Sequence, residues 1–164
     1  MHTHDLSISV QTAVLTVSDT RTKQTDLSGT AINELLIESG HSVKEYSIVS
    51  DDIELISSFI RTQSENPEIQ AIIITGGTGF TPRDVTYEAV SRLFEKEMTG
   101  FGELFRSLSY EEIGVKAMFS RAAAGSRNGC AIYALPGSLN AVKLGMTKLI
   151  LPSIQHFTEE LNRI

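Results

Sequence analysis

The apolar residues in the first half of the chain gather in three short segments. Residues 12–17 and 71–75 are almost wholly apolar, and residues 41–49 alternate partly between apolar and polar. Apolar runs of this length are typical of strands that are covered on both faces of a parallel sheet. Between them, residues 28–39 and 53–65 carry apolar side chains at helical spacing. The pattern therefore predicts a β-α-β-α-β order and a parallel sheet.

The middle of the chain is predicted to be mostly helical. Residues 85–94 form an expected helix, and the Gly-Phe-Gly sequence at positions 100–102 is expected to break the chain. Helical patterns return at residues 103–108 and, for a short piece, at residues 115–119. We therefore expect separate helices on the two sides of the glycine pair.

The last third of the chain contains a hairpin signal. Two strand-like segments, residues 122–127 and 130–135, flank Asn128 and Gly129. An Asn-Gly pair accepts the positive φ angles of a type I′ turn, so it indicates a hairpin. A helix is expected after the second strand, and Pro152 is expected to interrupt it before a last amphipathic helix.

Together, these elements predict one α/β domain. It has a single doubly wound, mostly parallel sheet with helices on both faces and a small β-hairpin in the C-terminal half. We assign it to residues 11–164, which contain no repeat and no linker. Residues 1–10 are expected to form a flexible N-terminal tail. His2 and His4 in this tail could bind a metal, but we favour a solvated chain end.

Composition narrows the class of protein. The chain has 164 residues, of which 41% are hydrophobic and 21% are charged, and its formal net charge is −6. An acidic chain without a basic cluster is a poor candidate for binding nucleic acid or an anionic membrane. No apolar run approaches the ~18 residues that are needed to span a bilayer. Cys130 is the only cysteine, so we expect no internal disulfide, a buried inert thiol and a cytoplasmic location.

The segment that follows residues 71–75 is the strongest local signal. Glycines occupy positions 76, 77 and 79, and Pro82 or Asp84 is expected to start a helix. A glycine loop between a strand and a helix N-terminus is a natural anion site. The spacing matches neither a Walker A loop nor the dinucleotide-binding fingerprint. Phosphate binding and a mere tight turn therefore both stay open.

Three further loops carry polar residues at the expected carboxyl ends of strands. Ser18 and Asp19 follow the first strand, Asp51 and Asp52 the second, and residues 136–138 the last. Ligands of doubly wound sheets bind at this edge. Structural alternatives remain, namely an Asx turn for Asp19, helix caps for Asp51, Asp84 and Ser138, and a solvated charge or a salt bridge for Arg83.

The chemistry of these loops favours one kind of site. They offer carboxylates, hydroxyls, glycines and an arginine, and the sequence shows no nucleophile arrangement and no His-rich or Cys-rich metal spacing. Mg²⁺ takes one or two carboxylates and completes its octahedron with phosphate and water oxygens. The residues therefore favour Mg²⁺ together with a phosphate ligand.

Short motifs occur along most of the chain in addition to the glycine loop. They are residues 18–21 (SDTR), 26–29 (DLSG), 76–79 (GGTG), 83–86 (RDVT), 98–103 (MTGFGE), 120–122 (SRA) with Gly125, and 135–138 (LPGS). Their combination resembles the MoaB/MogA family of molybdenum cofactor biosynthesis proteins, and the length is similar to the MoaB-type branch. The resemblance covers the chain from about Thr12 to its C-terminus. Leu139 departs from it, because family members often have proline there, and we expect a small effect.

The resemblance implies a molybdopterin-binding domain that adenylylates molybdopterin with ATP and Mg²⁺ and releases pyrophosphate. It also implies a homotrimer or homohexamer that passes its product to the molybdate-insertion enzyme. By motif position, Asp51 and Asp84 match functional acidic residues, so we assign both to catalysis and to Mg²⁺. Ser120 matches a serine of the pterin-binding region. The residues expected to bind the ligands are Ser18, Asp19, Gly76, Gly77, Thr78, Gly79, Arg83, Ser120, Pro136, Gly137 and Ser138.

Two other functions stay open at this point. A non-catalytic molybdopterin-binding or carrier protein would keep the same motifs. A hydrolase of pyrophosphate bonds, similar to the N-terminal domain of CinA-type proteins, would share the fold, but Thr78 and Arg83 in the glycine loop argue against it.

Overall fold

The computed structural model describes residues 8–164. Residues 1–7, which include both histidines of the expected tail, lie outside the described residues. At the end of that tail, Val10 is buried, and its backbone N–H donates to Nδ1 of His41 at 3.0 Å. The hydrophobic core therefore already includes the residue before the first strand.

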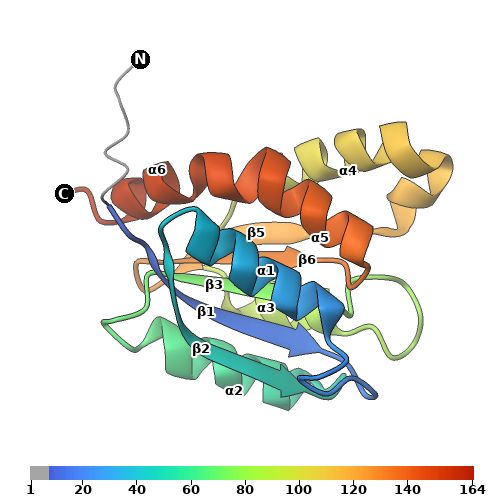
Figure 1. Ribbon diagram of the computed structural model, residues 1–164, viewed down its shortest axis with the longest axis horizontal. Helices are drawn as coiled ribbons and strands as arrows, with labels where there is room; N and C mark the ends of the chain where they lie inside the picture. Colours follow the sequence, from blue (N-terminus) through green and yellow to red (C-terminus); the bar gives the residue numbers. More distant parts are fainter. Residues whose placement is uncertain (1–7) are drawn as a thin grey trace.

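One mixed sheet of six strands runs through the middle of the molecule (Figure 1). Its order is β2-β1-β3-β6-β5-β4; the first four are parallel neighbours, and β5 is antiparallel to both β6 and β4. The order reverses beside β1, which confirms the predicted doubly wound α/β fold. The strands are β1 (Gln11–Val17), β2 (Ser42–Val49), β3 (Ala71–Thr75), β4 (Lys96–Glu97), β5 (Ala123–Arg127) and β6 (Cys130–Leu135).

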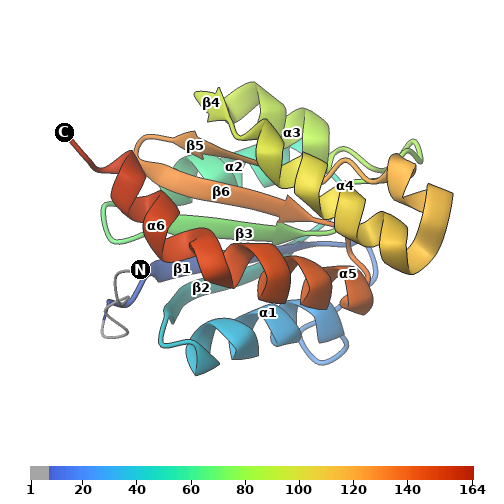
Figure 2. The ribbon, with the colours of Figure 1, turned by 90° about the horizontal axis from the view of Figure 1, so that it is seen from above.

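Helices cover both faces of the sheet, as predicted (Figure 2). Side chains alternate along the strands, so that Val14 and Ile73 enter one core and Leu15 and Ile72 enter the other. The first core is covered by α1 (Leu27–Glu38), α4 (Thr99–Ile113), α5 (Leu139–Gly145) and α6 (Leu151–Leu161), and the second by α2 (Ile53–Ser64) and α3 (Thr86–Leu93). Within residues 8–164, no helix has the length and apolar character required to cross a membrane.

The predicted hairpin is confirmed. Strands β5 and β6 pair with Arg127 opposite Cys130, and Asn128 and Gly129 between them have φ angles of 54° and 75°. Positive φ at both central residues is the type I′ geometry. Burial raises the pKa of the Cys130 thiol to about 12, which agrees with an inert thiol. The two-residue strand β4, which the sequence did not predict, extends the sheet beyond the hairpin.

The prediction that Gly100, Phe101 and Gly102 break the chain is wrong, because all three lie inside α4. Phe101 and Phe105 are one helical turn apart and both are buried. Their packing outweighs the low helix propensity of glycine, which costs about 1 kcal/mol per residue relative to alanine. A Cβ atom at Gly102 would lie only 2.8 Å from the carbonyl oxygen of Ala122. The glycine therefore allows α4 to approach the chain before β5.

The prediction that Pro152 interrupts the last helical region is also wrong. Helix α5 continues through a π-helical turn (Met146–Ile150) directly into α6, and Pro152 lies in the first turn of α6. The N–H of Leu151 bonds to the carbonyl of Met146, five residues earlier. Because this wide turn rearranges the hydrogen bonds just before proline, the helical path continues.

Candidate ligand-binding site

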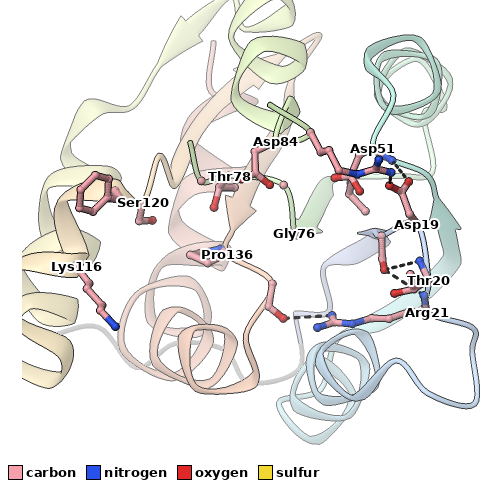
Figure 3. Close-up of a pocket in the computed structure, with 17 residues that line it drawn as sticks. Asp19, Thr20, Arg21, Asp51, Gly76, Thr78, Asp84, Lys116, Ser120 and Pro136 are labelled. Atoms are coloured by element: carbon pink, nitrogen blue, oxygen red, sulfur yellow. Dashed lines mark hydrogen bonds and ion pairs between the residues drawn. The ribbon is translucent and has the colours of Figure 1, made fainter. Parts of the chain in front are cut away.

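A cavity of about 700 Å³ opens at the carboxyl ends of β1, β2, β3 and β6 (Figure 3). It lies where the strand order reverses beside β1, the usual ligand position in a doubly wound sheet. Every predicted site residue except Ser138 lines it. The lining residues are Val17, Ser18, Asp19, Thr20, Arg21, Asp51, Gly76, Gly77, Thr78, Gly79, Arg83, Asp84, Lys116, Phe119, Ser120, Pro136 and Gly137.

The glycine loop after β3 is tightly folded. Gly76 and Gly77 have φ angles of 104° and 73°, which residues with side chains rarely adopt. A Cβ atom at Gly76 would overlap the carbonyl oxygen of Val17. Within the part of the chain that the structure describes, no acceptor takes the backbone N–H of Gly77, Thr78 or Gly79. The loop therefore keeps donors available for an anion.

Helix α3 begins later than the sequence predicted. It starts at Thr86 and not at Pro82 or Asp84, and no side-chain hydrogen bond caps it. Thr86 uses its hydroxyl and its N–H to bond the carbonyls of Gly76, at 2.7 Å, and Gly77, at 2.9 Å. The glycine loop itself therefore fixes the first residue of the helix.

The interpretation of Asp84 as a helix cap is wrong for the same reason. Its Oδ2 accepts hydrogen bonds from the backbone N–H and the hydroxyl of Thr81, at 3.0 and 2.8 Å. This closes a turn and leaves the carboxylate beside Gly79, where an added Cβ would lie 2.8 Å from Asp84 Oδ2. Asp84 thus lies against the glycine loop and lines the cavity.

Asp51 lines the cavity and does not cap a helix. Asp52 caps α2 by accepting the N–H of Leu55 at 3.0 Å. Burial is the larger cause that raises the pKa of Asp51, and the negative charge of Asp84 is the second. The two carboxylates therefore repel each other. In residues 8–164, no group of three or more His, Cys, Asp or Glu could hold a metal. Two carboxylates match the chemistry of a Mg²⁺ site only when phosphate and water oxygens complete the octahedron.

Asp19 connects three loops of the cavity. One of its oxygens accepts the N–H of Asp51 at 3.0 Å, and the other forms an ion pair with Arg83 (Figure 3). The Asx-turn interpretation of Asp19 is therefore wrong. Ser18 makes the local turn instead, because its hydroxyl accepts the N–H groups two and three residues later. The salt-bridge interpretation of Arg83 is confirmed, and this side chain is 70% exposed.

Ser138 does not line the cavity. Its hydroxyl accepts the N–H of Ala141 at 3.2 Å and caps α5, so the capping interpretation is confirmed. Pro136 and Gly137, just before it, do line the cavity. A Cβ atom at Gly137 would lie 3.3 Å from Cα of Gly76. The loop after β6 and the glycine loop are therefore in contact.

Two of the lining residues that sequence reasoning missed are cations. Arg21 follows the polar loop after β1, which was a usable signal, and its Nη1 donates to the Gly137 carbonyl at 3.2 Å. Lys116 and Phe119 come from a 3₁₀ turn (Gly114–Phe119), and nothing in the sequence marks them. The lining thus carries three basic and three acidic side chains, and two of the basic ones, Arg83 and Arg21, form ion pairs with Asp19 and Asp26.

Ser120 borders a second cavity as well. This cavity has a volume of about 410 Å³, and its walls include Phe80, Tyr87 and Arg106. Nη1 of Arg106 donates to the carbonyl of Ser120 at 3.3 Å. Because Ser120 lines both cavities, the two adjoin.

The fold and this cavity define the chain as a doubly wound α/β protein whose ligand site lies at the reversal in strand order. Residues 13–156 match the model of a family described as "Probable molybdopterin binding domain". The chain belongs to this family, which includes the MoaB and MogA proteins, and the membership supports a role in molybdenum cofactor biosynthesis.

Relatives and solved structures agree with this membership. Molybdenum cofactor biosynthesis protein B of Halalkalibacterium halodurans is 48% identical over 161 residues, which cover 98% of this chain and 95% of that protein. A crystal structure of a molybdenum cofactor biosynthesis protein B has a TM-score of 0.93 at 48% identity, over 96% of this chain and 99% of the other. The crystal structure of the tungsten cofactor synthesizing protein MoaB from Pyrococcus furiosus has a TM-score of 0.84 at 35% identity. The match covers 94% of this chain and 98% of the other.

Proposed function

We propose that the chain adenylylates molybdopterin with ATP and Mg²⁺ and releases pyrophosphate. One observation carries the proposal: Asp51 and Asp84 share a cavity, at a glycine loop in which the N–H groups of residues 77–79 have no acceptor among the described residues. Membership in a family of molybdenum cofactor biosynthesis proteins supports the choice of molybdopterin as the second substrate.

The proposed reaction joins two phosphates. An oxygen of the terminal phosphate of molybdopterin attacks the α-phosphorus of ATP and forms a P–O bond. The bond between the α-phosphorus and the β-phosphate oxygen breaks, and pyrophosphate leaves with the electron pair. The attacking phosphate is already ionised at neutral pH, so a strong general base is not needed. Catalysis then consists mainly of positioning and charge neutralisation.

Each part of the cavity has a role in this proposal. The N–H groups of Gly77, Thr78 and Gly79 and the hydroxyl of Thr78 donate to phosphate oxygens. Arg21 and Lys116, which line the same cavity, balance the charge of the triphosphate. Asp51 and Asp84 hold Mg²⁺, which when bound supplies positive charge beside the phosphates.

The second cavity gives molybdopterin a place beside the nucleotide. Phe80 and Tyr87 in its walls offer aromatic surface to a flat pterin ring. Ser120, which lines both cavities, lies where the phosphate of molybdopterin would pass from one to the other. The two substrates would therefore meet at the edge of the sheet.

The test is a direct assay with a matched pair of variants. Purified protein is mixed with molybdopterin, ATP and Mg²⁺, and chromatography follows adenylylated molybdopterin and pyrophosphate, which are expected in equal amounts. Asp84→Asn should lower turnover by ~100-fold or more with little change in Tm, because the amide oxygen can still accept from Thr81 but loses the charge. Asp52→Asn is the control, because Asn caps a helix as well as Asp does, and it should keep full turnover.

The outcomes separate the candidate functions. Full turnover by Asp84→Asn would contradict its metal-binding role. Saturable molybdopterin binding without any product would favour the non-catalytic carrier. A protein that neither binds molybdopterin nor forms product would contradict both functions.

The remaining expectations are part of the same proposal. They are a homotrimer or homohexamer, transfer of the product to a molybdate-insertion enzyme, and a cytoplasmic location. Exposed apolar side chains on α4 and the following 3₁₀ turn, among them Ile113 and Val115, support the existence of a subunit interface.

A further inference from the structure

Arg121, just before β5, contacts a loop that is about forty residues away in the sequence. Its backbone N–H donates to the carbonyl of Thr78 at 2.9 Å. Its Nε and Nη2 both donate to the carbonyl of Gly79, at 3.1 and 2.8 Å, and Nη2 also lies 3.3 Å from the carbonyl of Asp84. One residue therefore holds the loop at both ends of residues 79–84.

The guanidinium group of Arg121 is itself fixed from three sides. Glu88 on α3 binds it with both carboxylate oxygens, at 2.5 and 3.1 Å. The rings of Phe80 and Tyr87 lie 4.8 and 5.6 Å from the guanidinium carbon, close enough for cation–π attraction. A planar guanidinium group that is held in this way presents its N–H donors in one fixed orientation.

Residues 79–84 have few other attachments. The structure shows hydrogen bonds between Thr81 and Asp84 inside the loop and an ion pair from Arg83 to Asp19 at the cavity mouth. The ring of Phe80 also makes an edge-to-face contact with Phe119, with a centroid distance of 6.2 Å. Phe80 is 64% exposed. Arg121 therefore supplies the hydrogen bonds that the structure shows between the backbone of this stretch and the body of the protein.

We propose that Arg121 is a positioning residue that fixes the Asp84 carboxylate beside Asp51 by holding the carbonyls of Gly79 and Asp84. Arg121 lines the second cavity but not the one that contains the two aspartates, so it acts on a cation there through the loop and not by direct contact. The inference rests on the proposed function in one respect, namely that the two aspartates bind a divalent cation with a nucleotide.

The test compares two conservative variants of arginines near the same strand. Arg121→Lys keeps the charge but cannot hold two carbonyls with a planar fork. Arg127→Lys is the matched control, because Arg127 also donates to a backbone carbonyl, that of Leu93 at 3.2 Å, but lies outside the cavity lining. Mn²⁺ replaces Mg²⁺ as the probe, and its binding is followed by electron paramagnetic resonance in the presence of ATP.

Arg121→Lys should weaken Mn²⁺ binding by ~10-fold or more, the usual effect of removing a partner that orients a metal ligand. Amide hydrogen exchange in residues 79–84 should become faster in the same variant without ligand. Arg127→Lys should change neither quantity. In turnover assays, the KM for the metal–nucleotide complex should rise more than kcat falls.

Three results would overturn the inference. They are unchanged Mn²⁺ affinity in Arg121→Lys, equal effects of the two variants, and no Mn²⁺ binding by the wild-type protein. Faster exchange with unchanged affinity would mean that Arg121 only stabilises the loop. The Mn²⁺ measurement does not depend on product formation, so the two proposals can fail separately. If Arg121→Lys weakens Mn²⁺ binding but the wild-type protein makes no adenylylated molybdopterin, the proposed function is contradicted and the role of Arg121 is confirmed.

Discussion

At the scale of single residues, Asp51 and Asp52 are adjacent but have different environments. Asp52 accepts the N–H of Leu55 and stabilises the start of α2. Asp51 lines the cavity, and its carboxylate is disfavoured by burial and by Asp84. Asp51 therefore lowers the free energy of unfolding, which a residue with a purely structural role would not be expected to do.

This difference predicts that Asp51→Asn slightly stabilises the protein without ligand, with a Tm that is equal to or a few degrees above wild type at pH 7. The pKa of Asp51 is raised from its ordinary 3.8, so its ionisation favours the unfolded chain, and the gain should vanish as the pH falls toward that value. Thermal unfolding without metal checks this. A clear loss of Tm at pH 7 would contradict it.

Gly76 and Gly100 are a second informative pair. Gly76→Ala places a Cβ against the Val17 carbonyl at a φ of 104°. It should cost about 2 kcal/mol or more, roughly 4–8 °C in Tm. Gly100→Ala, in α4 with nothing within 4 Å of the added Cβ, should instead stabilise by up to about 1 kcal/mol. Equal Tm values for the two variants would show that Gly76 is not required for the backbone geometry.

At the scale of elements, the buried carboxylate of Asp26 joins α1 to two strands. It is 1% exposed and accepts hydrogen bonds from Thr16 on β1 at 2.6 Å and from Tyr46 on β2 at 2.5 Å. Its other oxygen caps α1 through the N–H of Gly29 at 3.0 Å. Ser28, in the first turn of α1, donates to the Gly137 carbonyl at 2.7 Å. The network therefore sets the position of α1 relative to one wall of the cavity.

This network predicts that Tyr46→Phe destabilises the protein by about 1–2 kcal/mol at pH 7. Burial first, and then the hydrogen bond to Asp26 and its charge, raise the pKa of Tyr46 above its ordinary 10.0. A raised pKa means that the folded state keeps the proton, so this stabilisation is complete below pH 10 and is lost as the pH rises further. Denaturant unfolding at pH 7 and above pH 10 checks the trend.

The control for that experiment is Tyr110→Phe. Tyr110 is 54% exposed on α4, so loss of its hydroxyl should change the unfolding free energy little at either pH. A Tyr46→Phe difference that stays constant with pH would contradict the role of the Tyr46 proton.

At the scale of the whole molecule, the expected homo-oligomer needs an apolar interface. Ile113 and Val115 are 54% and 63% exposed near the end of α4. Replacing both with Glu should shift the mass toward that of the monomer in size-exclusion chromatography with light scattering. Leu27→Glu is the control, since Leu27 is 66% exposed at the start of α1. An unchanged trimer or hexamer in the double variant would place the interface elsewhere.

Local patterns were sufficient for most of the architecture of the molecule, but they did not reveal the short edge strand β4. The apolar run in β3 predicts a strand buried on both faces, and the Asn128–Gly129 pair predicts the hairpin, because each signal is contained in a few neighbouring residues. The order of these elements then leaves few topologies besides a doubly wound sheet. The same order predicts which loops share the carboxyl edge, and hence most of the cavity lining.

Only the tertiary structure decided what individual side chains do at that edge. Whether Asp51 or Asp52 caps α2, where α3 begins and whether a glycine pair interrupts α4 depend on contacts between distant segments. Lys116 reaches the cavity and Arg121 holds the glycine loop for the same reason. Local sequence sets backbone propensity and burial pattern, whereas the free energy of a polar side chain depends on which partners the fold brings to it.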